Sequence, residues 1–331
     1  MRLAVSVGIS PRESLRDWAE FSAKLEQRGV DRLWLIDSQL AMKDVYAGLN
    51  AAAAATSRIE LGPGVTNLLT RHPSVTAGAM AALAELSDGR ALLGLGAGDS
   101  AVRGIGARPS RIAEVEQAVR FFRAVLAGEP AEWDGRELKL PHRPLRVPIH
   151  LAVSRPRMCR LAGALADGAI VMGAAEPELV AQQVGWIGEG AQEAGRDPGE
   201  VELAFVATTS PGDDRAALDD VRSWASAQAR LLAEVEDLPP SLEAHRDELV
   251  HAKESYDFGE HLSTRAGHQA SVSDELVRLL AVAGDADTCA KRLRGLLEAG
   301  VGEFIFPLMG GGRLERLKRL RDEVLPALAP L

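Results

Sequence analysis

Apolar and polar positions divide the chain into short apolar runs that alternate with longer segments of helical periodicity. Spacings of three and four residues, as in Leu15, Trp18, Phe21 and Leu25, give the longer segments one apolar face. Runs such as LWLI and AIVM are apolar throughout, which is typical of parallel strands covered on both sides. The eight runs are residues 3–8, 32–37, 58–65, 91–98, 147–153, 169–174, 201–207 and 303–309.

Eight such β/α units predict an α/β fold, a TIM (β/α)8 barrel in which residues 1–331 form a single domain. A doubly wound parallel sheet is the alternative fold. The absence of a GxGxxG motif at the start of the first helix weakens that alternative.

The connection after the seventh run is much longer than the others. Residues 208–283 contain an acidic, helix-rich part and then the stretch SYDFGEHLSTRAGHQASVSDE. Such an insertion after the seventh barrel strand is a place for a lid or a substrate wall. A dimer contact is the alternative for its first half, whereas Tyr256, His261 and His268 favour a pocket role for the second half.

Composition narrows the range of partners and locations. The formal net charge of −9, without a run of Lys or Arg, argues against nucleic acid as a partner. Cys159 and Cys289 lie far apart and outside any CxxC pattern, so we expect reduced thiols. The N-terminus lacks the apolar stretch of a secretory signal, and no run is long enough to span a membrane. We therefore expect a soluble, cytoplasmic protein.

The ends of the predicted strands indicate where chemistry takes place, because TIM-barrel active sites lie at the carboxyl ends of the strands. Glycine at four of these six ends would let a flat ligand lie close to bare backbone. The ends are Asp37-Ser38, Gly64-Val65-Thr66-Asn67, Gly94-Leu95-Gly96-Ala97-Gly98-Asp99, Ala152-Val153-Ser154, Met172-Gly173 and Met309-Gly310-Gly311-Gly312.

Other kinds of active site find little support in the sequence. The first strand ends in Ser6-Val7-Gly8 in place of a His-x-His pair, and His150 lies in mid-strand as a predicted interior residue, so we expect no metal site. The chain contains no GxSxG elbow and no P-loop. A glycine-lined mouth with few ionisable groups favours a bound flat cofactor that supplies the chemistry.

A phosphate group could bind after the fifth strand. Ser154, Arg155 and Arg157 lie at the start of a predicted helix, where free N–H groups attract anions. A plain helix cap with solvated arginines explains the same residues equally well.

Three segments resemble one known family, the bacterial luciferase-like superfamily, and within it the branch of methylenetetrahydromethanopterin reductase. They are VTNLLTRHPSVTAGAMAALAELSDGRALLGLGAGDS (65–100), SRPRMCRLAGALADGAIVMG (154–173) and AGDADTCAKRLRGLLEAGVGEFIF (283–306). The resemblance covers nearly the whole chain apart from residues 208–260.

The resemblance implies a TIM barrel that binds coenzyme F420 or a flavin at its mouth, and a homodimer. It implies a cis peptide bond at Gly64-Val65, behind the middle ring of the cofactor. The residues that would contact the cofactor on this basis are Asp37, Ser38, Gly64, Val65, Thr66, Asn67, Gly96, Ala97, Gly98, Ala152, Val153, Ser154, Arg155, Met172 and Gly173.

Two positions depart from the family pattern. Ser38 stands where the related sugar-phosphate and alcohol dehydrogenases carry a catalytic His, which argues against those two activities. Arg155 stands where a Gly is common, and it would strengthen the phosphate site or close part of the channel.

The leading functional prediction is an F420-dependent oxidoreductase that transfers a hydride to an unsaturated or carbonyl small molecule. Asp37, Asp99, Tyr256 and His261 are the candidate catalytic proton donors. The alternatives are an FMN-dependent monooxygenase whose reduced flavin comes from a separate reductase, and a flavin-binding barrel without catalysis, for which Ser38 is the one indication.

Overall fold

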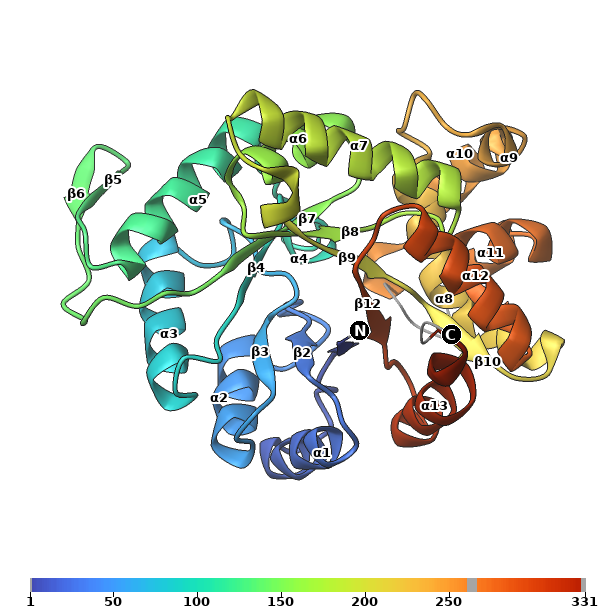
Figure 1. The fold of residues 1–331 in the computed structure, drawn as a ribbon, viewed down its shortest axis with the longest axis horizontal. Coiled ribbons are helices and arrows are strands. Elements are labelled where there is room, and N and C mark those ends of the chain that lie inside the picture. Colours follow the sequence, from blue (N-terminus) through green and yellow to red (C-terminus); the bar gives the residue numbers. More distant parts are fainter. Residues whose placement is uncertain (1, 261–266, 329–331) are drawn as a thin grey trace.

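Eight parallel strands form the centre of the molecule in a computed structural model that describes residues 2–260 and 267–328 (Figure 1). Their order is β3-β2-β1-β12-β9-β8-β7-β4, and bridges between Leu61 and Ala91 and between Thr66 and Leu95 join β3 to β4. The barrel strands are β1 (Leu3–Val7), β2 (Arg32–Leu35), β3 (Glu60–Pro63), β4 (Leu93–Leu95), β7 (Ile149–Val153), β8 (Gly168–Val171), β9 (Glu202–Val206) and β12 (Glu303–Pro307). Each of the eight predicted runs overlaps one barrel strand, and the TIM-barrel prediction is confirmed.

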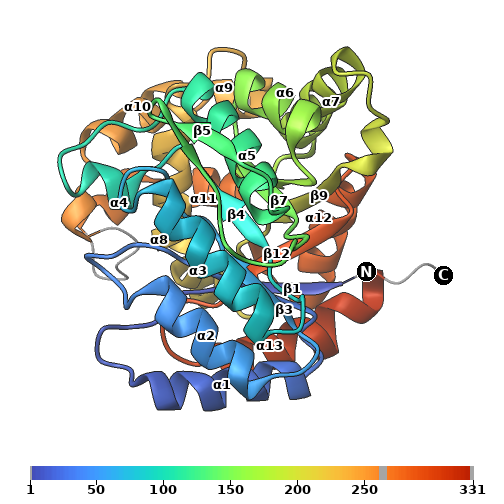
Figure 2. The ribbon, with the colours of Figure 1, turned by 90° about the vertical axis from the view of Figure 1, so that its left-hand side faces the viewer.

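Helices surround the barrel (Figures 1 and 2). In α1 the expected face buries Trp18, Phe21 and Leu25 against the strands. The outer helices are α1 (Leu15–Gln27), α2 (Val45–Ala55), α3 (Pro73–Leu86), α4 (Ser100–Arg103), α5 (Ile112–Leu126), α6 (Pro156–Leu165), α7 (Pro177–Glu193), α12 (Ala286–Glu298) and α13 (Arg313–Arg319). A small antiparallel hairpin of β5 (Ala131–Trp133) and β6 (Arg136–Leu138) projects beyond α5.

The barrel interior is filled by side chains that alternate along each strand. One buried apolar cluster occupies the middle: Ala4, Trp34, Leu92, Ile170, Ala204 and Ile305. Val65, Met172 and Val206 pack on this cluster but are only partly buried. These three side chains follow the middle layer toward the carboxyl ends of the strands, so the mouth has an apolar floor.

Charged side chains fill the opposite, amino-terminal end of the barrel. Arg32 is buried and pairs with Glu60 (2.7 Å), Glu202 (3.1 Å) and Glu303 (3.3 Å). His150 is also buried, as predicted, and its Nε2 lies 3.2 Å from Glu202. The hydrogen bond from His150 is the main cause that lowers the pKa of Glu202, whereas burial raises the pKa of Glu303. The barrel is therefore closed by ion pairs at this end.

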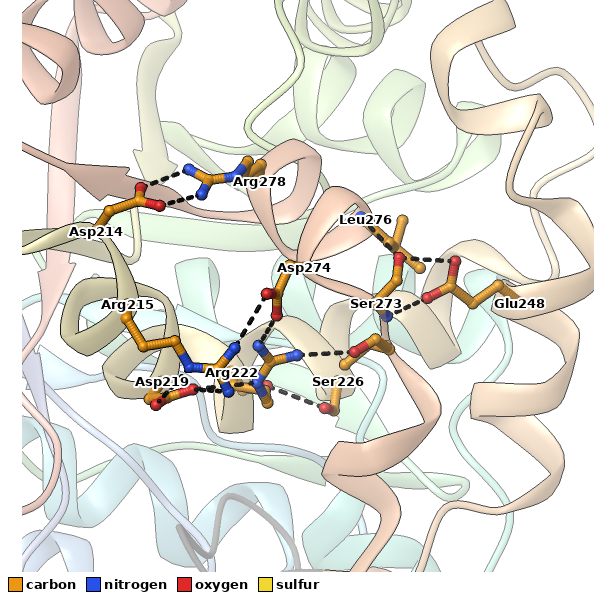
Figure 3. A network of polar contacts seen from close by, with 11 residues as sticks. Asp214, Arg215, Asp219, Arg222, Ser226, Glu248, Ser273, Asp274, Leu276 and Arg278 are labelled. Atoms are coloured by element: carbon orange, nitrogen blue, oxygen red, sulfur yellow. Dashed lines mark hydrogen bonds and ion pairs between the residues drawn. The ribbon is translucent and has the colours of Figure 1, made fainter.

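The described part of the insertion, residues 208–260 and 267–283, lies between β9 and α12. The strands β10 (Thr209–Pro211) and β11 (Val282–Gly284) stand at its two ends and pair in parallel. Between them lie α8 (Asp214–Leu232), α9 (Pro240–Glu243), α10 (Arg246–Glu254) and α11 (Asp274–Leu280), which share one apolar cluster with Ala174 and with Leu179 of α7. Figure 3 shows ion pairs between α8 and α11, where Arg215 lies 3.1 Å and Arg278 2.8 Å from aspartates of the other helix.

Among the described residues, no helix combines the length and the apolar character needed to cross a bilayer.

Candidate functional site

The floor of the mouth is made of small and apolar residues from the ends of four strands, β3, β4, β7 and β8. A Cβ atom added at Gly96 would lie 2.9 Å from Val65 Cγ2 and 3.7 Å from Ala152 Cβ. The Gly64-Val65 peptide bond is cis, as the resemblance implied. Gly64, Val65, Ala152 and Met172 all keep part of their surface exposed. A flat ring can therefore approach the backbone here.

Asp37 follows β2 and is enclosed by donors. Its Oδ2 accepts hydrogen bonds from Thr66 Oγ1 and from Arg71 Nη1, each at 2.7 Å, and only 1% of its side chain is exposed. Arg71 also pairs with Asp44 (2.8 Å) and lies over the ring of Tyr46, with Cζ 5.1 Å from the centroid. Burial raises the pKa of Tyr46 to about 12. This network forms a polar edge beside the apolar floor.

Two loop residues near Asp37, Asn67 and Ser38, stabilise turns through local hydrogen bonds. Asn67 Oδ1 accepts from the N–H groups of Leu69 and Thr70, each at 2.9 Å, which holds the chain after β3 in a turn. The Ser38 carbonyl accepts from the N–H of Met42 at 2.8 Å and so begins a turn after β2. Both residues are buried at the mouth.

Asp99 follows β4 and connects the barrel to the insertion. One carboxylate oxygen pairs with Arg230 of α8, and the other lies 3.3 Å from Arg103 Nε. The Arg230 guanidinium lies over a pair of neighbouring rings, with Cζ 4.8 Å from the centroid of Tyr256 and 5.0 Å from that of Phe258. The structure thus brings Asp99 and Tyr256 together through Arg230. His261, the fourth candidate proton donor, lies outside the described residues.

The predicted phosphate site lies at the start of α6. Within the described chain no side chain caps this helix; Arg155 occupies the cap position, Pro156 is the first helical residue and Ser154 is partly exposed. The first N–H groups of α6 are therefore available to an anion. The Arg155 side chain, however, pairs with Glu234 of the insertion. Because Lys253 also hydrogen-bonds that carboxylate, the pKa of Glu234 falls to about 2.

Gln183 of α7 holds the ends of β7 and β8 together. Its Nε2 donates to the carbonyl groups of Ser154 (3.1 Å) and Met172 (2.9 Å). Its Oε1 is buried and has no partner among the described residues. A Cβ atom at Gly173, whose φ is +146°, would lie 3.5 Å from that Nε2, so the two strand ends and Gln183 pack closely.

Most predicted site residues lie at or directly after the carboxyl ends of the strands. Val153 lies there as well, but its side chain belongs to the large buried apolar cluster shared by strands and helices, the outer core, and only its backbone lies at the mouth. Ala97 likewise packs against the outer core, and Gly98, at φ +91°, packs against Val102.

Arg71, Gln183 and Arg230 were not predicted. Arg71 lies within the segment of residues 65–100 that resembles the family, close after a glycine-bearing strand end, and this position is the sequence signal for it. Gln183 and Arg230 lie on helices whose rotation against the barrel is set by tertiary packing.

The described residues contain no group of three or more His, Cys, Asp or Glu side chains placed to hold a metal ion. Both cysteines are free and buried.

Comparisons with known proteins agree with this geometry. A family model described as luciferase-like monooxygenase matches residues 2–303. The chain is 30% identical to the 5,10-methylenetetrahydromethanopterin reductase of Methanolobus tindarius, over 95% of this chain and 97% of that one. It is 27% identical to the F420-dependent glucose-6-phosphate dehydrogenase of Kineococcus radiotolerans, over 94% and 93% of the two chains.

A solved structure shares the fold. The coenzyme F420 dependent tetrahydromethanopterin reductase from Methanopyrus kandleri superposes with a TM-score of 0.78 at 24% identity, covering 99% of this chain and all of that one. Fold, sequence match and the resemblance of the three segments all lead to one conclusion: the chain belongs to the luciferase-like monooxygenase family.

Proposed function

We propose that this protein is an F420-dependent oxidoreductase that transfers a hydride between the deazaflavin and an unsaturated or carbonyl small molecule. The relatives at 30% and 27% identity are a methylenetetrahydromethanopterin reductase and an F420-dependent dehydrogenase by name. The observation that carries the proposal is the floor of Gly64, Val65, Gly96 and Ala152, which is small and apolar. Gly64, Val65 and Ala152 are partly exposed at the strand ends, and Gly96 is buried beside them.

The residues present fit such a cofactor. The floor accepts a flat ring, the network of Asp37, Thr66 and Arg71 provides a polar edge, and Asn67 adjoins it. The uncapped first turn of α6 suits a phosphate, with Ser154 beside it. Ser38, Ala97, Gly98, Val153, Arg155, Met172 and Gly173 complete the proposed cofactor contacts. When bound, F420 supplies the hydride, and the chain supplies position and proton transfer.

Of the two strand-end carboxylates, we assign proton transfer to Asp99. Its side chain is 36% exposed, whereas that of Asp37 is 1% exposed and sealed by Thr66 and Arg71. A proton donor must reach the reacting group, and only Asp99 has open surface from which to do so. Asp37 then positions the loop after β3. Tyr256, which lies against Arg230, and His261 are the alternatives for the same step.

We further propose that residues 1–331 act as one domain, with residues 208–283 as a lid over the mouth. Two ion pairs support this role: Arg230 with Asp99, and Arg155 with Glu234. Both join the insertion to a strand end of the proposed cofactor site. We also propose a cytoplasmic location, in keeping with two free thiols, and a separate reductase that regenerates the reduced cofactor.

A homodimer through α2 and α3 is part of the proposal. These helices lie side by side (Figure 2), and Glu85 is the one charged residue in their sequences. Val75 is 58% exposed on α3, and Ala82 and Leu86 are exposed further along the same helix. This face, whose one charged residue is the exposed Glu85, suits a second copy of itself in a two-fold contact. Light scattering should give the mass of a dimer for the wild type and of a monomer for Ala82→Glu.

Titration with F420 and with FMN tests the proposed cofactor. We expect F420 to bind more tightly, and Gly96→Ala to weaken that binding by about tenfold or more, about 1.4 kcal/mol, because the new Cβ displaces Val65. Gly185→Ala, where nothing lies within 4 Å of the new atom, is the control. Gly64 is unsuitable as a probe, since a Cβ there would lie 2.5 Å from Trp34 Cβ and disturb the barrel interior.

Binding of FMN alone would overturn the assignment in favour of a monooxygenase. Binding of either cofactor without turnover of any acceptor would favour a barrel that has lost catalysis.

A further inference from the structure

We propose that a cleft beside β1 and β12 binds an uncharged, largely apolar part of the substrate. The inference rests on the proposed function and names the substrate class of the same site. The cleft measures about 410 Å³ and is lined by Gly8, Ser10, Pro11, Glu13, Ala41, Met42, Leu308, Met309, Gly310 and Arg313. Its volume is in the range of small-molecule sites, which are mostly apolar with a few polar groups.

The cleft lies on the carboxyl side of two adjacent barrel strands. Gly8 directly follows β1, and Leu308 follows β12, with its N–H donating to the Ser6 carbonyl at 2.8 Å. Along β1 the side chain of Ala4 faces the interior while Val5 and Val7 face the outer core, so Ser6 and Gly8 continue the inner face.

The same alternation applies on β12. Ile305 faces the interior and Leu308 the outer core, which leaves Met309 on the inner side. A Cβ atom at Gly8 would lie 2.3 Å from Met42 Sδ, so Met42 covers the inner face of Gly8. Met42 and Met309 therefore stand on the mouth side of the cleft.

The cleft and the proposed cofactor residues occupy different parts of the barrel mouth. Those residues come from the ends of β2, β3, β4, β7 and β8, and none of them lines the cleft. A molecule in the cleft is thus placed at the opposite side of the same barrel mouth. The turn that begins at Ser38, where a His is found in dehydrogenases of the family, carries Met42 into this position.

The chemistry of the lining excludes a strongly charged ligand. The two ionisable side chains in the cleft, Glu13 and Arg313, pair with each other at 2.6 Å. Arg313 also lies over the ring of Phe21, with Cζ 4.1 Å from the centroid. What the rest of the lining offers a ligand is methionine, proline, alanine and glycine surface with the Ser10 hydroxyl. Thioethers adapt to varied apolar shapes.

Calorimetric titration of the protein with unbranched methyl ketones of increasing chain length, and with the matching carboxylates, tests the proposal. We expect ketone affinity to rise about fourfold per added methylene until the cleft is full, and carboxylates to bind about tenfold more weakly. In Met42→Gln and Met309→Gln the gain per methylene should fall below about twofold. Leu40→Gln changes the same loop at a side chain that is 70% exposed and outside the cleft, so it should keep the wild-type gain.

An affinity that does not change with chain length, carboxylates that bind as tightly as ketones, or an equal loss in Leu40→Gln would each overturn the proposal. The titrations are run with and without F420. Because no proposed cofactor residue lines the cleft, a gain per methylene seen without F420 supports the cleft even if F420 itself does not bind.

Discussion

The two carboxylates at the strand ends differ in what surrounds them. Asp37 is enclosed by Thr66 and Arg71, whereas Asp99 shares its oxygens with Arg230 and Arg103 and keeps open surface. Both residues stand directly after a strand, and the sequence predicts both as candidates. Their separation into a positioning and a reacting group depends on neighbours that are distant along the chain.

Asp99→Asn is expected to lower kcat by about 100-fold to 10,000-fold, the usual contribution of a general acid, with F420 affinity within about threefold of the wild type. Asp37→Asn is expected to weaken F420 binding more than it lowers kcat, because it loosens Arg71 and Thr66. Fluorescence titration and steady-state kinetics of the two variants check this. The reverse pattern would assign proton transfer to Asp37.

The two thiols should be unreactive in the native protein. Burial raises the pKa of Cys159 to about 12 and that of Cys289 to about 11, so at about pH 8 very little thiolate is present. Because the folded-state pKa values are raised, stability is lost as the pH rises above about 8.5, where unfolded thiols ionise. A thiol reagent should label both cysteines only after denaturation; rapid native labelling would contradict the burial.

At the scale of elements, the insertion separates the features that the sequence predicts from those that it does not. The eight strands and the face of α1 follow from apolar periodicity, since that pattern directly reports which side is buried. The length of one connection predicts an insertion over residues 208–283. Its docking does not, because a contact such as Arg230 with Asp99 joins residues 131 apart, and no local pattern encodes the pair.

Arg230→Met is expected to loosen the insertion from the barrel. The variant removes one of the two arginine partners of Asp99 and the cation over the rings of Tyr256 and Phe258. Limited proteolysis and hydrogen exchange should show faster opening of residues 254–260, about tenfold or more, with little change in the barrel strands.

Arg215→Met is the matched control for this variant, since the partners of Arg215 among the described residues, Asp219 and Asp274, both lie within the insertion. Equal opening in both variants would mean that the Asp99 contact does not hold the insertion in place.

At the scale of the whole molecule, the two ends of the barrel differ in function. The carboxyl end carries the floor, the polar edge and the cleft, whereas the amino end holds Arg32 among Glu60, Glu202 and Glu303. The sequence predicted His150 as interior but not this network, because its members come from four strands. In TIM barrels the amino end serves stability.

Arg32→Met is expected to cost about 3 kcal/mol of unfolding free energy at neutral pH, because it removes a counter-charge of buried Glu303. Burial raises the pKa of Glu303, so its carboxylate is protonated more readily in the folded protein as the pH falls. The decrease in unfolding free energy caused by Arg32→Met should therefore become smaller toward about pH 5. Urea unfolding at both pH values measures this, and F420 affinity should not change.

Arg2→Met is the control, as Arg2 pairs with the same three glutamates but is 42% exposed, and its loss should cost less than about 1 kcal/mol. Equal costs for both variants, or weaker F420 binding in Arg32→Met, would contradict the division between the two ends.

The most direct test of the central claim follows the fate of the reduced cofactor on the enzyme. The protein is loaded with reduced F420 or, in a separate preparation, with reduced FMN. One sample of each complex is exposed to air, and a second sample is mixed with an unsaturated ketone in the absence of oxygen. Hydride transfer predicts that reduced F420 is retained in air and is oxidised when the ketone is added. Rapid oxygen consumption by the FMN complex, together with no binding of F420, would contradict the account.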